Sequence, residues 1–272
     1  MNTPIGVFDS GVGGLTVARE LFKIVPSEDV VYFGDVGRYP YGIRSKEIIT
    51  KFTIQDIQFL LEQDVKFIIC ACNTASSVAL DDISKNYTVP MIGVIRPGAE
   101  AAVKVTKNGR IGVIGTHATV NSNAYARVIH DIDPDIKVFS LACPLFVPLA
   151  EEGYIDKEAT YLIARDYLKT MHGVEVDTLI LGCTHYPLLK HVIGDVMGDS
   201  VTLIDSGEET AKAAFKMLTE RELLCSATTQ IPGPEGEHNF YVSDVPEKFS
   251  QVATRFLGRV VDRITRVDVS GY

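Results

Sequence analysis

The sequence predicts an α/β protein with two similar, doubly wound domains, each built on a mainly parallel sheet, and a cleft between them. Short β-branched runs alternate with longer helical patterns along the chain. Several of these runs are almost entirely apolar, as strands are in parallel sheets that helices cover on both faces. Alternating strands and helices of this kind are typical of doubly wound folds with right-handed crossovers.

The predicted elements follow one another in a regular order. The strands are Ile5–Phe8, Val30–Phe33, Phe67–Cys70, Met91–Val94, Ile111–Ile114, Lys137–Leu141, Thr178–Leu181, Val201–Ile204 and Phe240–Val242. Helical patterns lie between them, and the clearest cover Lys46–Gln63 and Lys157–Met171, where apolar residues recur at helical spacing.

The composition is that of an ordinary folded protein rather than a fibre, a coiled coil or a disordered tail. Of the 272 residues, 46% are hydrophobic and 22% are charged, which suits two ordinary domains or one large one. The formal net charge of −9 makes nucleic acid an unexpected partner, because an acidic surface repels phosphates. The apolar run at residues 67–72 is far shorter than the ~20 residues of a membrane helix, so we expect no membrane association.

The cysteine count predicts reduced thiols and a cytoplasmic location. Five cysteines are an odd number for a disulfide framework, and no secretory signal pattern is visible. Each cysteine therefore needs an explanation from chemistry or from packing.

Two pairs of segments look like internal repeats. Residues 5–10 resemble residues 111–116, and residues 67–74 resemble residues 179–185. The offsets are similar, 106 residues from Ser10 to Thr116 and 111 residues from Cys72 to Cys183. Chance similarity between buried strands is the alternative. Two similar halves would each present one cysteine at the carboxyl end of a strand, where open α/β sheets bind ligands, and would place both in one cleft.

Two loops follow the first two predicted strands. The glycines of Asp9–Gly14 let the backbone approach a ligand, and the helix that follows attracts an anion at its N-terminus. A dinucleotide site is one alternative, with Asp35 as the ribose-binding acid, although Thr16 stands where the fingerprint needs a glycine. Helix capping by the first two residues of the loop is another. Arg38–Gly42 predicts either a plain turn or a rigid loop that lines a pocket.

The two repeated cysteines are the candidate reactive groups. Cys72 and Cys183 are each followed by polar residues where a helix should begin, and a helix N-terminus lowers the pKa of a thiol. The remaining cysteines lack such a context and are assigned to the core or to turns: Cys70, Cys143 and Cys225.

Three chemistries can use these thiols. Zinc binding would take Cys70, Cys72, Cys183 and His185, but the close-paired ligand spacing of most zinc sites is absent. A cysteine hydrolase would use one thiol with a histidine base and leave the other thiol unexplained. Inversion of a stereocentre needs a base on one face and an acid on the other, and a thiolate and a thiol across a cleft meet that demand.

Three further side chains can assist proton transfer at the thiols. Asp9 belongs to the half that carries Cys72, whereas Glu151 and His185 belong to the half that carries Cys183. A solvated helix end is the alternative for Glu151, and a structural histidine is the alternative for His185.

Taken together, these segments resemble the bacterial glutamate racemases of the aspartate/glutamate racemase family. The resemblance extends in order over nearly the whole chain and is carried by Phe8–Val17, Pro40–Gly42, Cys72–Ala75 and Gly182–Leu188. It implies the fold predicted above, with the active site in the cleft between the domains. It also implies an isomerase without cofactor or metal that interconverts L- and D-glutamate. Such an enzyme supplies D-glutamate for peptidoglycan, and hence for cell-wall biogenesis and cell shape.

The resemblance also assigns roles to residues. Cys72 would act on the D-enantiomer with support from Asp9, and Cys183 on the L-enantiomer with support from Glu151 and His185. The substrate contacts would come from Asp9, Ser10, Tyr41, Gly42, Asn73, Thr74, Thr116, Thr184 and His185. The first domain would comprise residues 1–94 and 207–272, covered in part by an amphipathic helix over Glu247–Ile264, and the second residues 95–206. An aspartate racemase is the nearest alternative, and a homodimer is left open.

Overall fold

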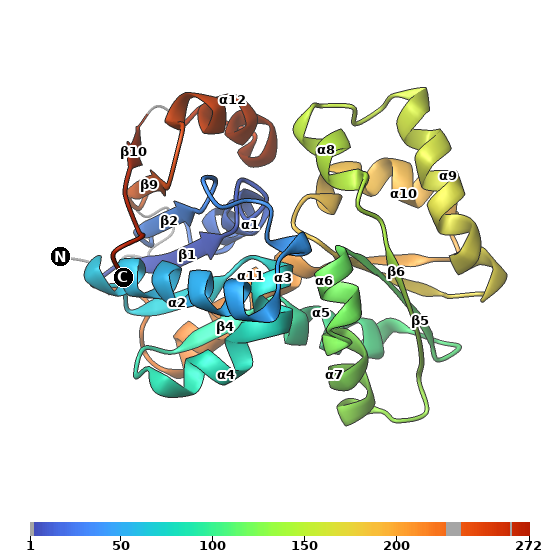
Figure 1. Ribbon diagram of the computed structural model, residues 1–272. Helices are drawn as coiled ribbons and strands as arrows, with labels where there is room; N and C mark the ends of the chain where they lie inside the picture. The colour runs from blue at the N-terminus through green and yellow to red at the C-terminus, as the bar shows by residue number, and fades with distance from the viewer. Residues whose placement is uncertain (1–2, 227–234, 262) are drawn as a thin grey trace.

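The computed structural model describes residues 3–226, 235–261 and 263–272, and in these residues it contains two sheets in which every strand pair is parallel (Figure 1). The larger sheet has the order β10-β9-β2-β1-β3-β4, with β1 (Ile5–Asp9), β2 (Val30–Gly34), β3 (Phe67–Cys70), β4 (Met91–Gly93), β9 (His238–Val242) and β10 (Ile264–Arg266). The smaller sheet has the order β6-β5-β7-β8, with β5 (Arg110–Gly115), β6 (Lys137–Ala142), β7 (Thr178–Gly182) and β8 (Thr202–Asp205). The predicted fold class is confirmed.

The two sheets repeat one strand order. The run β2-β1-β3-β4 in the larger sheet corresponds strand by strand to β6-β5-β7-β8 in the smaller one. Strand β3 therefore occupies the place in its sheet that β7 occupies in the other. Cys72 follows β3 and Cys183 follows β7, so the two cysteines lie at equivalent points of the two halves.

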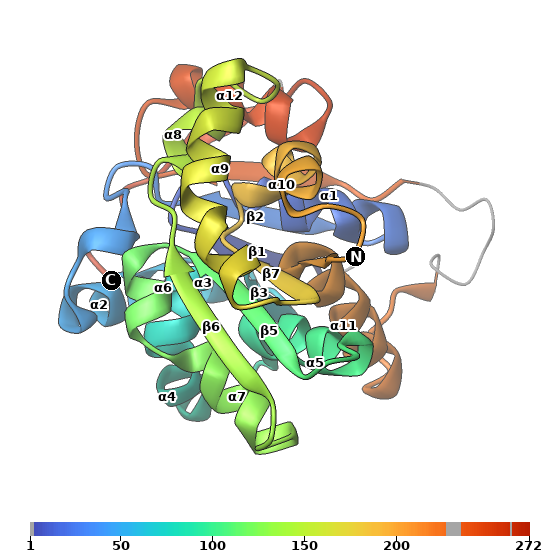
Figure 2. The same cartoon turned by 90° about the vertical axis from the view of Figure 1, so that its right-hand side faces the viewer.

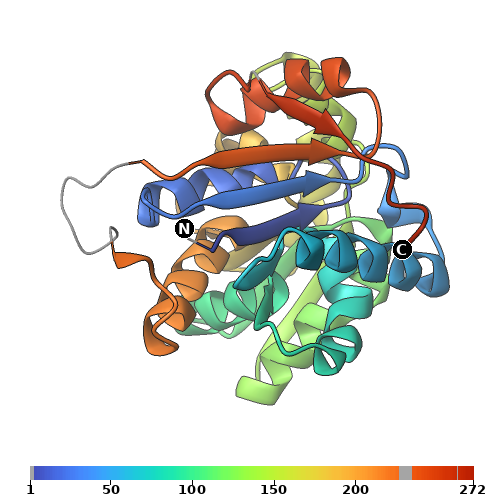
Figure 3. The same ribbon diagram turned by 90° about the vertical axis from the view of Figure 1, so that its left-hand side faces the viewer.

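Helices cover both sheets. On the larger sheet, α1 (Leu15–Ile24) packs against α11 (Ser206–Glu220) and α12 (Pro246–Leu257), and α2 (Lys46–Glu62) packs against the π-helical turn η2 (Ser76–Leu80). Figure 3 shows the strands of this sheet running in one direction. On the smaller sheet, α9 (Glu158–Gly173) packs against α10 (Lys190–Met197), and α5 (Ile95–Val105) against α7 (Ala124–Ile132), as Figure 2 shows. The shorter helical segments are α3 (Asn73–Ala75), α4 (Asp81–Ile83), α6 (His117–Asn121), α8 (Phe146–Glu151), η1 (Tyr41–Ile43), η3 (Ser84–Asn86) and η4 (Tyr186–Leu189).

The two halves share a core. Helices α5 and α11 carry the chain from one sheet to the other and pack against each other. One buried apolar cluster runs from Ile5 and Val7 in β1 to Ile114 in β5 and Leu181 in β7. This continuous core packs the two sheets together below the cleft. Helix α5 begins at Ile95 and helix α11 at Ser206, and the domain boundaries predicted at residues 94/95 and 206/207 fall at or within one residue of these starts.

The C-terminal prediction is wrong in part. The predicted helix Glu247–Ile264 ends at Leu257, because Gly258 adopts a left-handed conformation (φ 77°) that terminates helices. Residue 262 of that prediction lies outside the described residues. The chain then forms β10, which the sequence analysis did not predict and which pairs with β9 at the sheet edge. None of the helices in the described ranges combines the length and apolar character that a bilayer crossing demands.

Candidate active site

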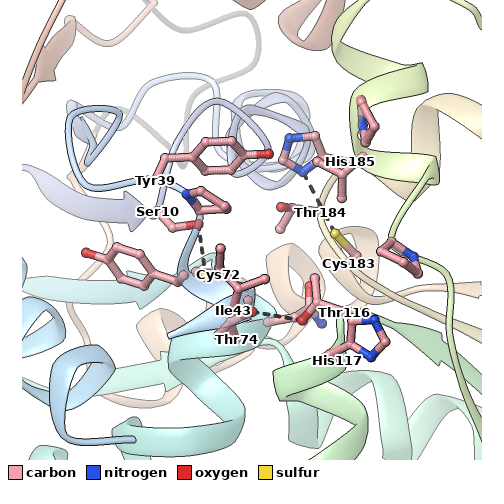
Figure 4. Close-up of a pocket in the computed structure, with 17 residues that line it drawn as sticks. Ser10, Tyr39, Ile43, Cys72, Thr74, Thr116, His117, Cys183, Thr184 and His185 are labelled. Atoms are coloured by element: carbon pink, nitrogen blue, oxygen red, sulfur yellow. Dashed lines mark hydrogen bonds between the residues drawn. The ribbon is translucent and has the colours of Figure 1, made fainter. Parts of the chain in front are cut away.

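A cavity of about 210 Å³ lies between the carboxyl ends of the two sheets (Figure 4). Both halves of the chain contribute to its wall, and both repeated cysteines reach it. The lining residues are Ser10, Tyr39, Pro40, Tyr41, Gly42, Ile43, Cys72, Asn73, Thr74, Thr116, His117, Pro144, Val147, Pro148, Cys183, Thr184 and His185. No lysine lies among them, so the wall offers no amine for a Schiff base.

Cys72 occupies the N-cap position of the short helix α3. Its sulfur accepts a hydrogen bond from the backbone N–H of Ala75 at 3.4 Å and donates one to the hydroxyl oxygen of Ser10 at 3.4 Å. Burial, followed by the nearby carboxyl of Asp9, raises the pKa of the Cys72 thiol to about 12. In the absence of substrate, Cys72 is therefore a protonated thiol at neutral pH.

Cys183 has a different neighbour. Its sulfur lies 3.8 Å from Nδ1 of His185, and Nε2 of His185 lies 2.9 Å from a carboxylate oxygen of Glu151. Burial opposes the charged imidazole, but the contacts with Cys183 and Glu151 prevail and raise the pKa of His185 to about 10. These contacts favour a positively charged imidazole beside the sulfur of Cys183.

Asp9 lies at the end of β1 and is buried behind the cavity wall. Its carboxylate accepts a hydrogen bond from the N–H of Gly11 at 2.9 Å. Burial raises the pKa of Asp9, and the positive charge of His185 opposes that rise only in part. Because Asp9 interacts electrostatically with Cys72 as well as His185, it connects the surroundings of the two thiols.

The glycine-rich loop after β1 packs against the other half of the protein. A Cβ atom at Gly13 would lie 2.2 Å from the hydroxyl of Thr184 and 2.5 Å from Nδ1 of His185, so only glycine fits there. The hydroxyl of Thr16 donates to the carbonyl oxygen of Thr184 at 3.0 Å and strengthens the same contact. The turn that follows Cys183 therefore packs directly against this loop.

The loop after β2 lines the cavity with an aromatic face and with backbone. The hydroxyl of Tyr41 is directed away from the cavity, to the buried carboxyls of Asp35 and Asp56. Burial and the neighbouring Asp35 raise the pKa of Asp56, and the paired guanidinium of Arg38 opposes that rise. Gly42 lies against Thr116 of the other half, where an added Cβ would be 3.0 Å from the threonine Cβ.

Comparison with known proteins identifies the family. The profile of the Asp/Glu/Hydantoin racemase family matches residues 5–214. The chain belongs to this family. The glutamate racemase of Geobacter metallireducens is 49% identical over 265 residues, which cover 97% of this chain and 96% of that protein.

Solved structures of glutamate racemases share the fold. The enzyme of Francisella tularensis in complex with D-glutamate has a TM-score of 0.91 and 42% identity over 100% of this chain and 99% of its own. Isoform RacE1 of Bacillus anthracis has a TM-score of 0.92 and 40% identity over 98% and 97%. As a member of the racemase family, the protein is an isomerase that acts on amino acids, as predicted.

Most of the predicted substrate-binding residues of this racemase reach the cavity. They are Ser10, Tyr41, Gly42, Asn73, Thr74, Thr116, Thr184 and His185. The hydroxyls of Thr74 and Thr116 lie 3.1 Å apart and join the two halves across the cavity. Asp9 and Glu151 are not part of the wall, and they contact it through their neighbours.

The sequence analysis missed several lining residues, of which Tyr39 has the most contacts. Its ring stacks on His185 with the ring centroids 6.3 Å apart, and it covers Gly11. Its hydroxyl bonds to Glu151, and burial followed by that carboxylate raises the pKa of Tyr39. The Arg38–Gly42 motif is the signal that pointed to it. The others are Pro40, Ile43, His117, Pro144, Val147 and Pro148, which have no distinguishing local pattern.

The zinc alternative has no support in the described part of the chain. There, no group of three or more histidine, cysteine or acidic side chains is arranged to hold a metal ion. The fourth member of the zinc set, Cys70, turns its sulfur to the carbonyl oxygen of Cys72 at 3.7 Å and does not line the cavity.

Proposed function

We propose that the protein is a glutamate racemase that inverts the Cα centre of L- and D-glutamate with two cysteines and no cofactor. One observation carries the proposal: Cys72 and Cys183 end equivalent strands of two repeated sheets and line the same cavity. The relatives named above, one of them bound to D-glutamate, support glutamate as the substrate.

The two thiols divide the proton transfer between them. For L-glutamate, the Cys183 thiolate takes the α-proton, the electron pair of the C–H bond stays on the substrate, and the Cys72 thiol returns a proton to the opposite face. The reverse reaction exchanges the roles. The unequal surroundings agree with this starting state, since His185 is cationic beside Cys183 and burial keeps Cys72 protonated.

The supporting residues act through these two thiols. His185 stabilises the thiolate of Cys183. The carboxylate of Glu151 stabilises the positive charge of the imidazole and fixes its orientation. Asp9 assists proton movement at Cys72, to which it is electrostatically coupled.

Recognition of glutamate requires acceptors for its ammonium and donors for its two carboxylates. Hydroxyls and backbone N–H groups at helix starts, such as Thr74 in α3 and Thr116 at the N-cap of α6, suit a carboxylate. Asn73 lines the cavity, and the carboxyl of Asp9, buried behind the wall, contributes negative charge that suits the ammonium.

The physiological role follows from the product. The enzyme works in the cytoplasm and supplies D-glutamate for peptidoglycan, and therefore for cell shape. Its two domains are residues 1–94 with 207–272, and residues 95–206, and they present one thiol each to the substrate.

Circular dichroism of glutamate and aspartate solutions tests the proposal. After exhaustive chelation and dialysis, the protein should racemise L-glutamate fully, with no absorbance band between about 320 and 430 nm from a bound pyridoxal or nicotinamide. Aspartate is one methylene shorter and leaves donors unpaired, at about 1–3 kcal/mol each, so it should react 10-fold to over 100-fold more slowly. Equal turnover of both would refute glutamate specificity, and activity that depends on added zinc would refute the two-thiol mechanism.

A further inference from the structure

Asn73 is held at the cavity wall by two hydroxyl groups from outside it. Its side-chain nitrogen lies 2.9 Å from the hydroxyl of Tyr125 in α7 and 3.5 Å from the hydroxyl of Ser206, the first residue of α11. All three side chains are almost completely buried. Neither Tyr125 nor Ser206 lines the cavity, and neither was predicted as a site residue.

The hydrogen-bond partners determine which end of the Asn73 amide faces Tyr125 and Ser206. The hydroxyl of Ser206 donates its single proton to the carbonyl oxygen of Leu181 at 3.0 Å, so toward Asn73 it can only accept. An amide turned the other way would set its oxygen against a hydroxyl with no proton to give. The nitrogen therefore faces Ser206, and its second N–H faces Tyr125.

The two hydroxyls use both N–H bonds of the amide. The amide oxygen is buried and makes no hydrogen bond inside the described structure. Tyr125 and Ser206 therefore provide the hydrogen bonds that fix the orientation of the Asn73 side chain, which lines the cavity.

We infer that Tyr125 and Ser206 are positioning residues that hold the Asn73 amide in the cavity wall, where it contacts the substrate. The inference rests on the proposed function and adds the residues that position this substrate-binding side chain. Leu181, whose carbonyl accepts the hydrogen bond of Ser206, lies two residues before Cys183, while Asn73 follows Cys72 directly. The hydrogen bonds therefore connect the Asn73 side chain to the strand that leads to the other thiol.

A double-mutant cycle tests the positioning role. Tyr125→Phe keeps the ring that packs against Gly98 and Gly182 but removes the acceptor. We expect it to raise KM for glutamate about threefold to tenfold in both directions, the effect of one lost hydrogen bond, with a smaller change in kcat. In an Asn73→Ala background, the same substitution should change KM by less than about 1.5-fold, because its target is gone.

Controls separate this role from a general structural one. Tyr161→Phe removes an exposed hydroxyl in the same half and should leave KM unchanged. Thermal melting shows whether Tyr125→Phe folds. If it does not, KM is measured for Ser206→Ala in the wild-type and Asn73→Ala backgrounds instead. The inference is overturned if neither variant changes KM twofold, or if the change is equal in the Asn73→Ala background. Inactive wild-type enzyme would refute the proposed function itself, whereas active wild type with unaffected variants refutes the positioning role alone.

Discussion

The Cys72 and Cys183 sites have the same origin in the fold but different chemical surroundings. Each cysteine follows the third strand of a β2-β1-β3-β4 or β6-β5-β7-β8 order, and each side chain is about 95% buried in one cavity. The partners differ: Cys72 contacts the hydroxyl of Ser10, and Cys183 contacts the imidazole of His185. Repetition of a strand order placed two thiols in one cavity, and the chain around each of them supplies a different polar neighbour.

This difference explains how one pair of identical groups can begin a reaction. Two neutral thiols contain no base, and two thiolates contain no acid. Burial near Asp9 favours the thiol at Cys72, and cationic His185 favours the thiolate at Cys183. In the proposed mechanism this is the state that accepts L-glutamate, and the product state carries the opposite protonation.

Removing either thiol gives the largest expected effect. Cys72→Ala and Cys183→Ala should each lower racemisation at least ~10²–10⁴-fold, because inversion needs an acid or base on both faces. In D₂O, Cys72→Ala should keep some deuterium wash-in to L-glutamate, and Cys183→Ala some wash-in to D-glutamate, measured by mass spectrometry. Cys225→Ala, outside the cavity, is the control. Near wild-type racemisation by either variant contradicts the two-base mechanism.

Replacing the imidazole of His185 should selectively affect proton exchange on the face of the substrate Cα that Cys183 serves. His185→Asn removes the cation beside Cys183, so wash-in of deuterium to L-glutamate should fall about 10²-fold. Wash-in to D-glutamate through Cys72 should fall much less. Overall racemisation must fall in both directions, since both pass through Cys183. His191→Asn, on the surface of α10, should behave as wild type. An equal loss of exchange for both enantiomers would show that the two sites do not differ as described.

The sequence predicted the repeated features well because they are local. Apolar strand runs followed by a cysteine can be recognised without any tertiary information, and they pointed to Cys72 and Cys183, which both line the cavity. Contacts between the halves cannot be recognised in this way. Gly13 needs to be glycine because Thr184, 171 residues later, lies against it, and nothing in the glycine loop reveals that neighbour.

The same limit applies to the site residues outside the repeated strands, whose contacts depend on the folded chain. Glu151 was predicted to support Cys183, and it contacts His185, which lies beside that thiol; only the folded chain brings α8 to that turn. Val147 and its neighbours line the cavity as ordinary apolar residues after β6. The hydroxyl of Tyr41 is used by buried carboxyls, so its side chain reaches the cavity through the ring. Such assignments depend on side-chain direction, which the sequence pattern does not contain.

Alkylation rates give a more direct comparison of the two thiols. Both are buried to a similar degree, so a difference in rate reports thiolate content rather than access. At pH 8, iodoacetamide should modify Cys183 at least about tenfold faster than Cys72, as peptide mass spectrometry can measure. In His185→Asn the advantage of Cys183 should disappear. Equal rates in the wild type would mean that Cys72 is not held as a thiol.

The smallest expected effect is on stability, where the two sites should differ in their pH windows. The pKa of His185 is raised on folding from about 6.5 to about 10, so its stabilisation is complete below pH 6.5 and is lost as the pH rises toward 10. The pKa of Asp9 is also raised, from 3.8, so its contribution begins to decline in the acid range instead. Urea unfolding at pH 4, 6, 8 and 10 should show the stability difference between wild type and His185→Asn shrinking by more than about 1 kcal/mol between pH 6 and 10, since one pKa unit corresponds to about 1.4 kcal/mol. The difference between wild type and Asp9→Asn should already shrink between pH 4 and 6. If the two difference curves run parallel across the whole range, the electrostatic distinction between the sites is wrong.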